Sequence, residues 1–391
     1  MKYLHIIFGL IISVNSYAQK LKSNDIYKAR AETMFQKVWD HYRLKQYPGL
    51  FAENYPSGNK VDLNYFQGSG VKEKEVSFLW PFSGMFSAAN VLIKFPDLKK
   101  KYENYLDTLK NGVWSYRDTT RRPIGYQAYP AALEKSDRYY DDNALVCIDY
   151  LESYLNTNDP AYITKAKEVF NFIISGWDEK LDGGVYWVEG HKDQKPACTN
   201  GMATLAALKL YQCSKDSLYL DWGKRFYNWM YARLRNPQGI YYNDVKMDGK
   251  PNEVYYTYNS GSMLEASVLL YHFTNDVKYI KEAEIIASST FSFFSSIDKQ
   301  GKRVFKIDLP WFVTVLFRGY EALYKVNQDP RFINAIVSHL DDAWEKSSDS
   351  LGFLSAKWAT DKEAKAKPKW LLDQACIAEL YGRISLLKIR H

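Results

Sequence analysis

Two adjacent aspartates, Asp141 and Asp142, are the residues of this sequence whose type and spacing best suit acid–base chemistry. They follow two tyrosines in the stretch RYYDDNAL (residues 138–145), directly before an apolar run typical of a helix. One interpretation is structural, because one aspartate can cap a helix N-terminus while a second compensates the helix dipole. The other is chemical. Two like charges in a partly buried setting raise one pKa, which leaves one carboxyl ionised and one protonated near neutral pH.

The adjacency of the two aspartates also constrains the reaction. Hydrolysis of a glycosidic bond uses one carboxylate and one carboxylic acid. Consecutive Cα atoms lie about 3.8 Å apart, so neighbouring side chains readily hold the separation of about 5–5.5 Å that retaining enzymes use. An inverting enzyme needs roughly 6.5–9.5 Å between carboxyls to admit a water. Adjacency therefore favours double displacement through a covalent intermediate.

Metal-ligating and nucleophilic residue types are scattered along the chain. The four cysteines (Cys147, Cys198, Cys213 and Cys376) form no CxxC pair, and the six histidines form no HExxH motif. We therefore expect no metal and no organic cofactor. An exported chain permits a disulfide, but the apolar helical surroundings of most of these cysteines favour buried free thiols.

A repeated sequence element predicts the architecture that must position the aspartate pair. An aromatic residue, an aspartate, a second aromatic residue and then Ile or Leu recur at a fixed spacing, four times along the chain. The aspartates of the four copies are Asp159, Asp216, Asp276 and Asp329. Each copy lies between two helical patterns, so we expect the aspartate to cap the second helix of a hairpin.

A second element, a glycine followed by aromatic or aliphatic residues, alternates with the first. It occurs at Gly49, Gly112, Gly184, Gly239, Gly301 and Gly352, and we expect each glycine to follow the end of a helix pair. The helices are predicted at 24–45, 79–94, 97–111, 142–156, 160–175, 197–213, 216–235, 258–273, 276–296, 310–326, 329–347 and 369–388.

Six helical hairpins can form an open solenoid or close into a ring. We favour closure, which makes the fold all-α: an (α/α)6 barrel of six helical hairpins, with inner helices that are less charged than their outer partners. The loops at the N-terminal ends of the inner helices then surround a central cavity. Its predicted lining comprises Trp80, Tyr140, Asn200, Tyr258, Asn259 and Trp311, with the aspartate pair at one helix start.

The composition and the N-terminal stretch indicate where the protein acts and which partners it has. Residues 1–18 combine Lys2, an apolar core from Leu4 to Val14 and a small-residue end at Ala18, as in a cleaved signal peptide. Residues 19–391 are expected to form a single catalytic domain, exported to the periplasm or secreted, with no membrane association after cleavage. The net charge of +7 is dispersed over 52 basic and 45 acidic residues, so we expect no nucleic-acid partner. A monomer is expected.

Four stretches in order resemble glycoside hydrolase family 76, the bacterial endo-α-1,6-mannanases. They are RYYDDNAL (138–145), DGGVYWVEG (182–190), KPACTNGMATLAALKLY (195–211) and YTYNSGSMLEASVLLY (256–271). The family's fold is an (α/α)6 barrel, as the repeat also predicts. The resemblance implies a mannan or manno-oligosaccharide substrate, cleaved at α-1,6 linkages by an endo action without a cofactor.

The resemblance also implies roles for individual residues. Asp141 matches the family's nucleophile and Asp142 its general acid/base. Tyr140 and Asn143 flank this pair, and Trp187, Asn200, Tyr258 and Asn259 fall in the other matching stretches as candidates that hold the mannose ring. Structural roles remain open for three of them: helix capping for Asn200 and Asn259, and loop packing for Trp187.

Two other functions remain open at this point. A sugar epimerase or a polysaccharide lyase can use the same fold, but epimerase chemistry requires histidines in the cavity, and the inner helix starts carry none. A glycan-binding protein without turnover is the second alternative. Both aspartates are present, and binding alone does not require the pair.

Overall fold

The computed structural model describes residues 25–58, 62–63, 71–72, 74–299 and 301–387; the predicted signal peptide lies outside this part. Six helices form an inner set: α2 (Leu79–Leu92), α4 (Tyr140–Thr157), α6 (Ala197–Ser214), α8 (Thr257–Thr274), α10 (Pro310–Asn327) and α13 (Leu371–Leu386). Six helices form an outer set: a helix over 25–42, α3 (Lys99–Trp114), α5 (Pro160–Ser175), α7 (Ser217–Leu234), α9 (Val277–Phe294) and α11 (Arg331–Lys346). All twelve coincide with predicted helices.

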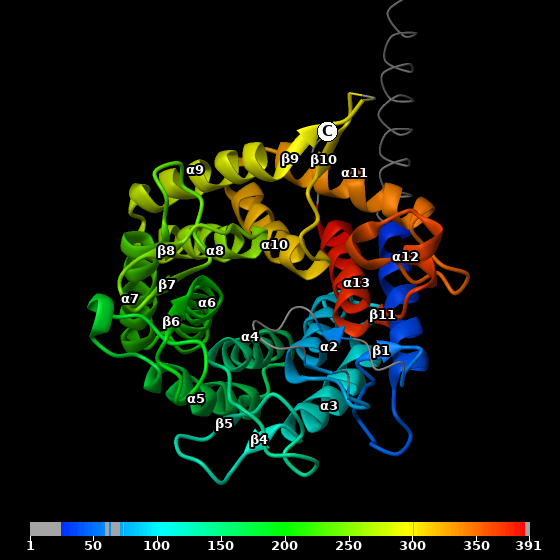
Figure 1. Cartoon of the computed structure of the whole chain (residues 1–391), viewed down its shortest axis with the longest axis horizontal. Helices are drawn as coiled ribbons and strands as arrows, with labels where there is room; N and C mark the ends of the chain where they lie inside the picture. Colours follow the sequence, from blue (N-terminus) through cyan, green and yellow to red (C-terminus); the bar gives the residue numbers. More distant parts are fainter. Residues whose placement is uncertain (1–24, 59–61, 64–70, 73, 300, 388–391) are drawn as a thin grey trace, which may run out of the picture.

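The inner helices close into a ring. Each of them contacts the next in the order α2, α4, α6, α8, α10 and α13, and α13 packs against α2 to complete the circle. The outer helices surround this ring, as Figure 1 shows. The N-terminal helix over 25–42 joins the far end of the chain, since Arg30 bonds Asp341 and Tyr381. The prediction of a closed (α/α)6 barrel is confirmed.

The recurring aspartates begin the outer helices as predicted. The side chains of Asp159, Asp216 and Asp276 each accept the backbone N–H two residues further on, at 2.9–3.1 Å, which satisfies one of the free donors at the helix start. The fourth copy differs, because Pro330 occupies the N-cap position of α11. Asp329 still accepts the backbone N–H of Arg331.

The glycine element is confirmed at five of its six positions. In these five loops the glycine has a positive φ of 78–90°, a conformation that costs glycine little. The exception is Gly112, which lies inside α3 rather than after it. A side chain there would come within 2.4 Å of the carbonyl oxygen of Gly49, so this glycine serves a close approach of two backbones rather than a turn.

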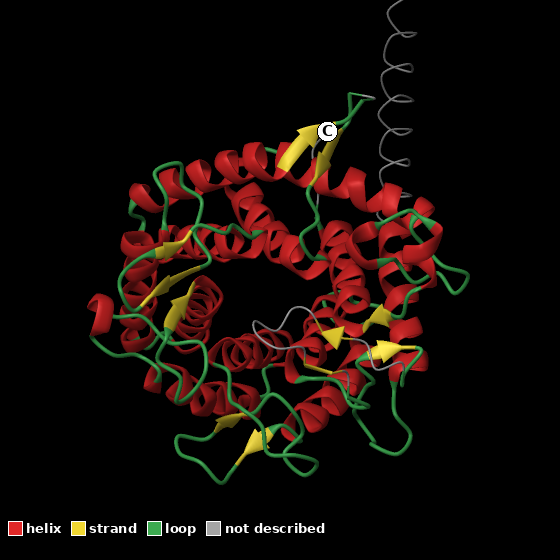
Figure 2. Cartoon of the chain, viewed as in Figure 1, coloured by secondary structure: helices red, strands yellow, loops and turns green. Residues whose placement is uncertain are grey.

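Short strands cover one end of the barrel (Figure 2). The largest group is the three-stranded antiparallel sheet of β6 (Gln194–Pro196), β7 (Asp244–Lys246) and β8 (Pro251–Asn252). Four pairs complete the set: β1 (Asn54–Tyr55) with β11 (Lys369–Trp370), β2 (Asp62–Leu63) with β3 (Val71–Lys72), β4 (Arg117–Asp118) with β5 (Gly125–Tyr126), and β9 (Ser295–Ile297) with β10 (Arg303–Phe305). Two 3-10 turns (Lys180–Asp182 and Ala356–Trp358) and the short helix α12 (Lys362–Ala366) complete the loops.

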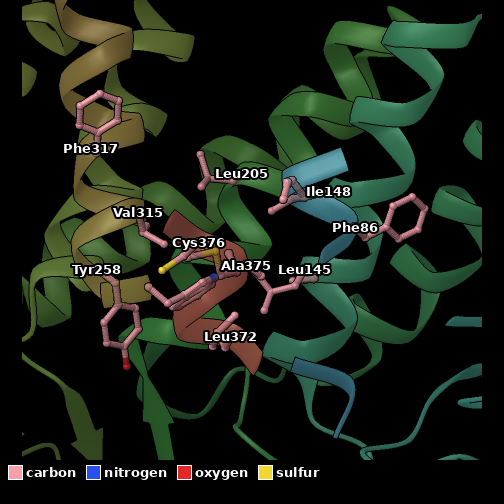
Figure 3. Packing of buried hydrophobic residues seen from close by; sticks show 14 of the residues in the cluster. Phe86, Leu145, Ile148, Leu205, Tyr258, Val315, Phe317, Leu372, Ala375 and Cys376 are labelled. Atoms are coloured by element: carbon pink, nitrogen blue, oxygen red, sulfur yellow. The ribbon is translucent and has the colours of Figure 1, made fainter. Parts of the chain in front are cut away.

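The interior of the ring is filled, not hollow. Figure 3 shows apolar side chains of the inner helices around its centre, among them Leu145, Leu205, Val315 and Leu372. Beyond them lies a layer of buried ion pairs: Lys209 with Glu152 and Glu265, and Arg318 and Arg383 with Glu379. These pairs link α4, α6, α8, α10 and α13.

Candidate active site

A cavity of about 820 Å3, counting the space at its open mouth, lies at the N-terminal ends of the inner helices. Its walls combine aromatic, polar and acidic side chains: Phe78, Trp80, Tyr139, Asp141, Asp142, Leu145, Trp187, Gln194, Pro196, Cys198, Met202, Asn243, Tyr258, Trp311 and Phe312. Both members of the aspartate pair therefore face the same cavity, at the end of the barrel where they were predicted.

The aspartate pair occupies the first turn of α4. The helix begins at Tyr140, and its N-cap residue, Tyr139, makes no side-chain capping bond. Asp141 accepts the backbone N–H of its neighbour Asp142 at 3.1 Å. Neither aspartate is at the N-cap position, so capping does not explain the pair.

Trp187 reaches Asp141 from a separate segment of the chain. Its indole Nε1 donates to Oδ2 of Asp141 at 3.0 Å. Two backbone hydrogen bonds hold this segment against the start of α4, from Tyr140 N to Trp187 O and from Glu189 N to Arg138 O, both at 3.0 Å. The fully buried guanidinium of Arg138 also pairs with the carboxylate of Glu189. The position of Trp187 is therefore fixed by several bonds.

Two glycines let this segment pass close to the outer helices. Gly183 and Gly184 both have a positive φ, of 120° and 86°. A Cβ atom on Gly184 would lie 2.4 Å from the indole ring of Trp229 on α7, and one on Gly183 would lie 2.2 Å from the ring of Trp177. The double glycine of DGGVYW thus allows the approach that places Trp187 over Asp141.

Hydrogen-bond donors counteract the effect of burial on Asp141. Burial raises the pKa of its carboxyl above the ordinary value, whereas the thiol of Cys198, the backbone N–H of Asp142 and the indole of Trp187 each lower it by donating to the carboxylate. Such donors favour the ionised form. These donors partly offset the burial of Asp141, whose pKa stays above the ordinary value.

Asp142 has the opposite environment. Its side chain receives no hydrogen bond from the described residues, and its pKa is raised well above the ordinary value by burial and then by the negative charge of Asp141. Both effects favour the neutral acid. The two carboxyls thus differ in their hydrogen bonding, although they are neighbours in sequence. The difference favours an ionised Asp141 and a protonated Asp142, as one nucleophile and one proton donor require.

An aromatic wall forms another side of the cavity. Trp80 lies edge-on to Trp311 and to Trp370, with ring centroids 5.2 Å and 5.3 Å apart. Phe312 stacks near Tyr258, with centroids 4.0 Å apart. Flat faces of this kind pack against the C–H faces of sugar rings. The predicted lining residues Trp80, Tyr258 and Trp311 are therefore in the cavity, together with Trp187.

Four other predicted contacts are not in the cavity wall. Asn143 is fully buried and bonds the backbone N–H and carbonyl of Tyr126 at 2.7 Å and 2.8 Å. Asn200 is equally buried and bonds the backbone of Val185 in the same way, at 2.7 Å and 2.9 Å. Both assignments to sugar contact are corrected. Both N–H groups of each amide and one side of each carbonyl oxygen bond the backbone, so these buried amides fasten loops to the inner helices.

Tyr140 and Asn259 are also corrected as sugar contacts. The ring of Tyr140 stacks on Phe172 of α5 with centroids 4.7 Å apart, outside the cavity. The side chain of Asn259 is fully buried, and neither its amide nitrogen nor its amide oxygen has a hydrogen-bond partner among the described residues. It does not line the cavity.

The sequence reasoning missed several residues of the wall. Gln194 and Pro196 lie in β6 and Asn243 directly precedes β7, in a sheet that was not predicted. Pro196 falls in the stretch at 195–211 that resembles family 76, whereas no pattern in the sequence marks Gln194 or Asn243. Phe312 and Tyr139 adjoin predicted residues and could have been found from that position alone. Cys198 was predicted only as a thiol in a helix, but it lines the cavity beside Asp141.

Metal ligands are not grouped in the described part of the chain, where no cluster of three or more His, Cys, Asp or Glu side chains is arranged to hold an ion. All four cysteines are free thiols. Among the described residues, no helix is both long enough and apolar enough to cross a membrane.

Two neighbouring carboxyls at the mouth of an aromatic-lined (α/α)6 barrel are typical of a carbohydrate-active enzyme. The model of glycosyl hydrolase family 76 matches residues 26–381, and the chain belongs to this family.

Known proteins similar to this chain include two with solved structures. A family 76 mannosidase from Bacteroides thetaiotaomicron VPI-5482 has a TM-score of 0.80 at 27% identity, covering 93% of this chain and 98% of that one. An inactive variant of the α-1,6-mannanase GH76A of Salegentibacter sp. HEL1_6, with two consecutive aspartates replaced, was solved in complex with alpha-1,6-mannotetrose. It has a TM-score of 0.75 at 20% identity and covers 93% of this chain and 99% of that one, a likeness that shows the fold alone.

A curated relative is the mannan endo-1,6-alpha-mannosidase of Saccharomyces cerevisiae. It is 29% identical over 153 residues, which cover 36% of this chain and 34% of the yeast protein. The match therefore spans about a third of the length of that relative.

Proposed function

We propose that this protein is a retaining α-1,6-mannanase that cleaves the backbone of mannan by an endo action. The observation that carries the proposal is the contrast between the two neighbouring carboxyls. Asp141 receives the indole N–H of Trp187, whereas the pKa of Asp142 is raised by burial and by the charge of Asp141. The substrate follows from the family, and the endo action from the name of the yeast relative.

In the first step, the carboxylate of Asp141 attacks the anomeric carbon of the mannose residue on the non-reducing side of the cleaved bond. The bond from that carbon to O6 of the next mannose breaks, and Asp142 gives its proton to O6, which leaves as a hydroxyl. The sugar is then esterified to Asp141, and Asp142 is a carboxylate. General acid catalysis of this kind requires a carboxyl that is still protonated at the working pH.

In the second step, water approaches the same carbon, and Asp142 takes one of its protons. The resulting hydroxyl attacks the anomeric carbon, the ester bond to Asp141 breaks, and Asp141 returns as a carboxylate. Two inversions at one carbon give net retention. Asp142 is again protonated, so the cycle closes without a net gain or loss of protons in the site.

We further propose that the mature chain acts outside the cytoplasm, in the periplasm or secreted, after removal of residues 1–18. Fractionation of cells that produce the full-length chain tests this proposal: the protein should appear outside the cytoplasm, with an N-terminus near residue 19. An uncleaved chain in the cytoplasmic fraction would contradict it.

The activity is tested by incubating purified protein with linear α-1,6-mannan and, in parallel, with α-1,2- and α-1,3-linked manno-oligosaccharides. We expect products from the α-1,6-linked polymer alone. Early products should span several oligosaccharide lengths, since release of mannose alone would indicate exo action. Asp141→Asn and Asp142→Asn should each lower kcat strongly, the second by roughly 10²–10⁴-fold. Binding of the polymer without any turnover by the wild type would favour a glycan-binding protein instead.

A further inference from the structure

Gln194 and Asn243 are cavity residues that the mechanism above does not use. Gln194 begins β6, which pairs with β7 so that Gln194 lies opposite Lys246, and Asn243 directly precedes β7. Gln194 is 5% exposed and Asn243 is 4% exposed, and both side chains line the same cavity as the aspartate pair. Both residues therefore border whatever occupies that cavity.

A charged partner fixes the orientation of the Gln194 amide. The ammonium group of Lys246 lies 2.6 Å from Oε1 of Gln194. An ammonium group has only donors, so it must face the amide oxygen and not the amide nitrogen. The NH2 group of Gln194 is then turned away from Lys246, and it makes no hydrogen bond to a described residue. Gln194 thus presents a donor.

A second charged partner, a carboxylate, fixes the orientation of the Asn243 amide. The amide nitrogen of Asn243 lies 2.9 Å from Oδ2 of Asp244, which also accepts from Asn252 at 2.8 Å. An ionised carboxylate has only acceptors, so it must face the NH2 group of Asn243. The carbonyl Oδ1 of Asn243 makes no hydrogen bond to a described residue. Asn243 thus presents an acceptor.

The charges behind these two amides offset each other. The ammonium group of Lys246 also lies 3.2 Å from Oδ1 of fully buried Asp244, so one positive and one negative group pair on the sheet. This part of the wall presents a neutral surface with one donor and one acceptor of fixed direction. Such a surface suits hydroxyl groups, which both donate and accept, better than a charged ligand.

We propose that Gln194 and Asn243 form a subsite that recognises hydroxyl groups of one mannose residue in the chain held beside Asp141 and Asp142. The amide N–H of Gln194 donates to one hydroxyl, and the carbonyl oxygen of Asn243 accepts from another. Lys246 and Asp244 act as positioning residues, because they fix the direction of each amide without touching the sugar. This inference rests on the proposed function and adds how the substrate is selected.

The test measures binding of α-1,6-mannotriose by calorimetry in the Asp142→Asn background, so that turnover does not interfere. Q194A and N243A should each weaken binding about tenfold, since each loses a hydrogen bond to the ligand. K246M should weaken it about threefold, because the amide of Gln194 is no longer held in one orientation. K250M is the matched control. Lys250 lies on the same hairpin with its side chain 84% exposed and paired with Asp248, and its removal should leave binding unchanged.

Monodeoxygenated α-1,6-mannotriosides separate direct recognition from a structural effect. Removal of the hydroxyl that Gln194 contacts should lower the affinity of the parent protein about tenfold but leave the affinity of Q194A unchanged. Removal of the hydroxyl that Asn243 contacts should have the same pair of effects on the parent protein and on N243A. Thermal unfolding of each variant checks that it is folded.

The failures are distinguishable. If the wild type hydrolyses α-1,6-mannan while Q194A and N243A bind as tightly as the parent, the subsite is wrong and the proposed function stands. If Q194A weakens binding but K246M does not, the positioning by Lys246 is wrong. If the wild type releases no product and Asp142→Asn does not bind the trisaccharide, the proposed function fails and the subsite fails with it.

Discussion

The indole Nε1 of Trp187 lies 3.0 Å from Oδ2 of Asp141, and this bond joins two segments that are 46 positions apart in the sequence. This bond gives two neighbouring carboxyls different hydrogen-bonding environments. Asp141 receives donors from Trp187, from the backbone of Asp142 and from Cys198, whereas Asp142 receives none from the described residues. Burial alone would raise both pKa values together. The donors oppose the effect of burial on Asp141, whereas no described residue opposes it on Asp142.

Replacing Trp187 by Phe should impair the proposed nucleophile, Asp141, while keeping an aromatic ring at position 187. The change removes a hydrogen bond to a charged group, which contributes about 1.5–3 kcal/mol, so kcat/KM should fall by roughly 10- to 100-fold. The indole lowers the pKa of Asp141, so its removal raises that pKa. The acidic limb of the kcat/KM profile, where Asp141 must be ionised, should therefore move to higher pH. An unchanged limb would show that Trp187 only packs against the loop.

Substitutions of Cys198 test a second hydrogen-bond donor to Asp141, and a serine variant serves as the matched control. Its thiol donates to Asp141 and lowers the pKa of that carboxyl. Cys198→Ala removes the donor and should move the acidic limb of the profile to higher pH. Cys198→Ser keeps a donor of similar size and should leave the limb close to that of the wild type. Equal profiles for the two variants would contradict a role for this group in setting the charge of Asp141.

Asp142 should reduce the stability of the fold near neutral pH. Its pKa is raised in the folded state, so above the ordinary carboxyl pKa the unfolded chain ionises more readily, and folding becomes less favourable as the pH rises towards the folded-state pKa. Asp142→Asn removes this cost. At pH 7 the variant should be more stable than the wild type by about 1 kcal/mol, and the difference should vanish below about pH 4, where Asp142 is protonated in both states. Thermal unfolding at both pH values measures it. A variant less stable than the wild type at pH 7 would contradict this account.

Asn143 should matter for stability and not for sugar binding. Its amide holds both backbone groups of Tyr126 and also donates to Tyr139 O at 2.7 Å. Asn143→Ala leaves buried groups unpaired and should lower the free energy of unfolding by about 2–4 kcal/mol. Gln374, the fourth residue of α13, holds the backbone N–H and carbonyl of Leu354 in the same manner, both at 2.9 Å.

Gln374→Ala is therefore the control for Asn143→Ala, with a comparable loss expected in chemical denaturation. In the folded fraction of either variant, the affinity for α-1,6-mannotriose should match that of the wild type. A selective loss of affinity in Asn143→Ala would restore the direct sugar contact that the sequence predicted.

The sequence predicted the barrel because its repeat has a direct physical cause. An aspartate that caps an outer helix must recur once per hairpin, as Asp159, Asp216 and Asp276 do, and apolar inner helices follow from burial on all sides. The aspartate pair was predictable because the repeat places it at an inner helix start and because the stretch RYYDDNAL resembles family 76.

The remaining parts of the site depend on contacts that no local pattern records. Asn200 was a candidate sugar ligand because it lies at a predicted inner helix start, in a stretch that resembles family 76. Its side chain instead bonds the backbone of Val185. Gln194 and Asn243 reach the cavity through a strand pairing between segments about 50 residues apart. Short strands in loops carry no periodicity long enough to detect.

The stereochemistry of the first product tests the central claim most directly, since it depends on the two adjacent aspartates acting as nucleophile and acid. Proton NMR during hydrolysis of α-1,6-mannan shows which anomer forms before mutarotation. The account predicts that the α-anomer appears first and that Asp141→Asn releases neither anomer. Initial release of the β-anomer would show direct attack by water and would contradict the assignment of Asp141 as nucleophile.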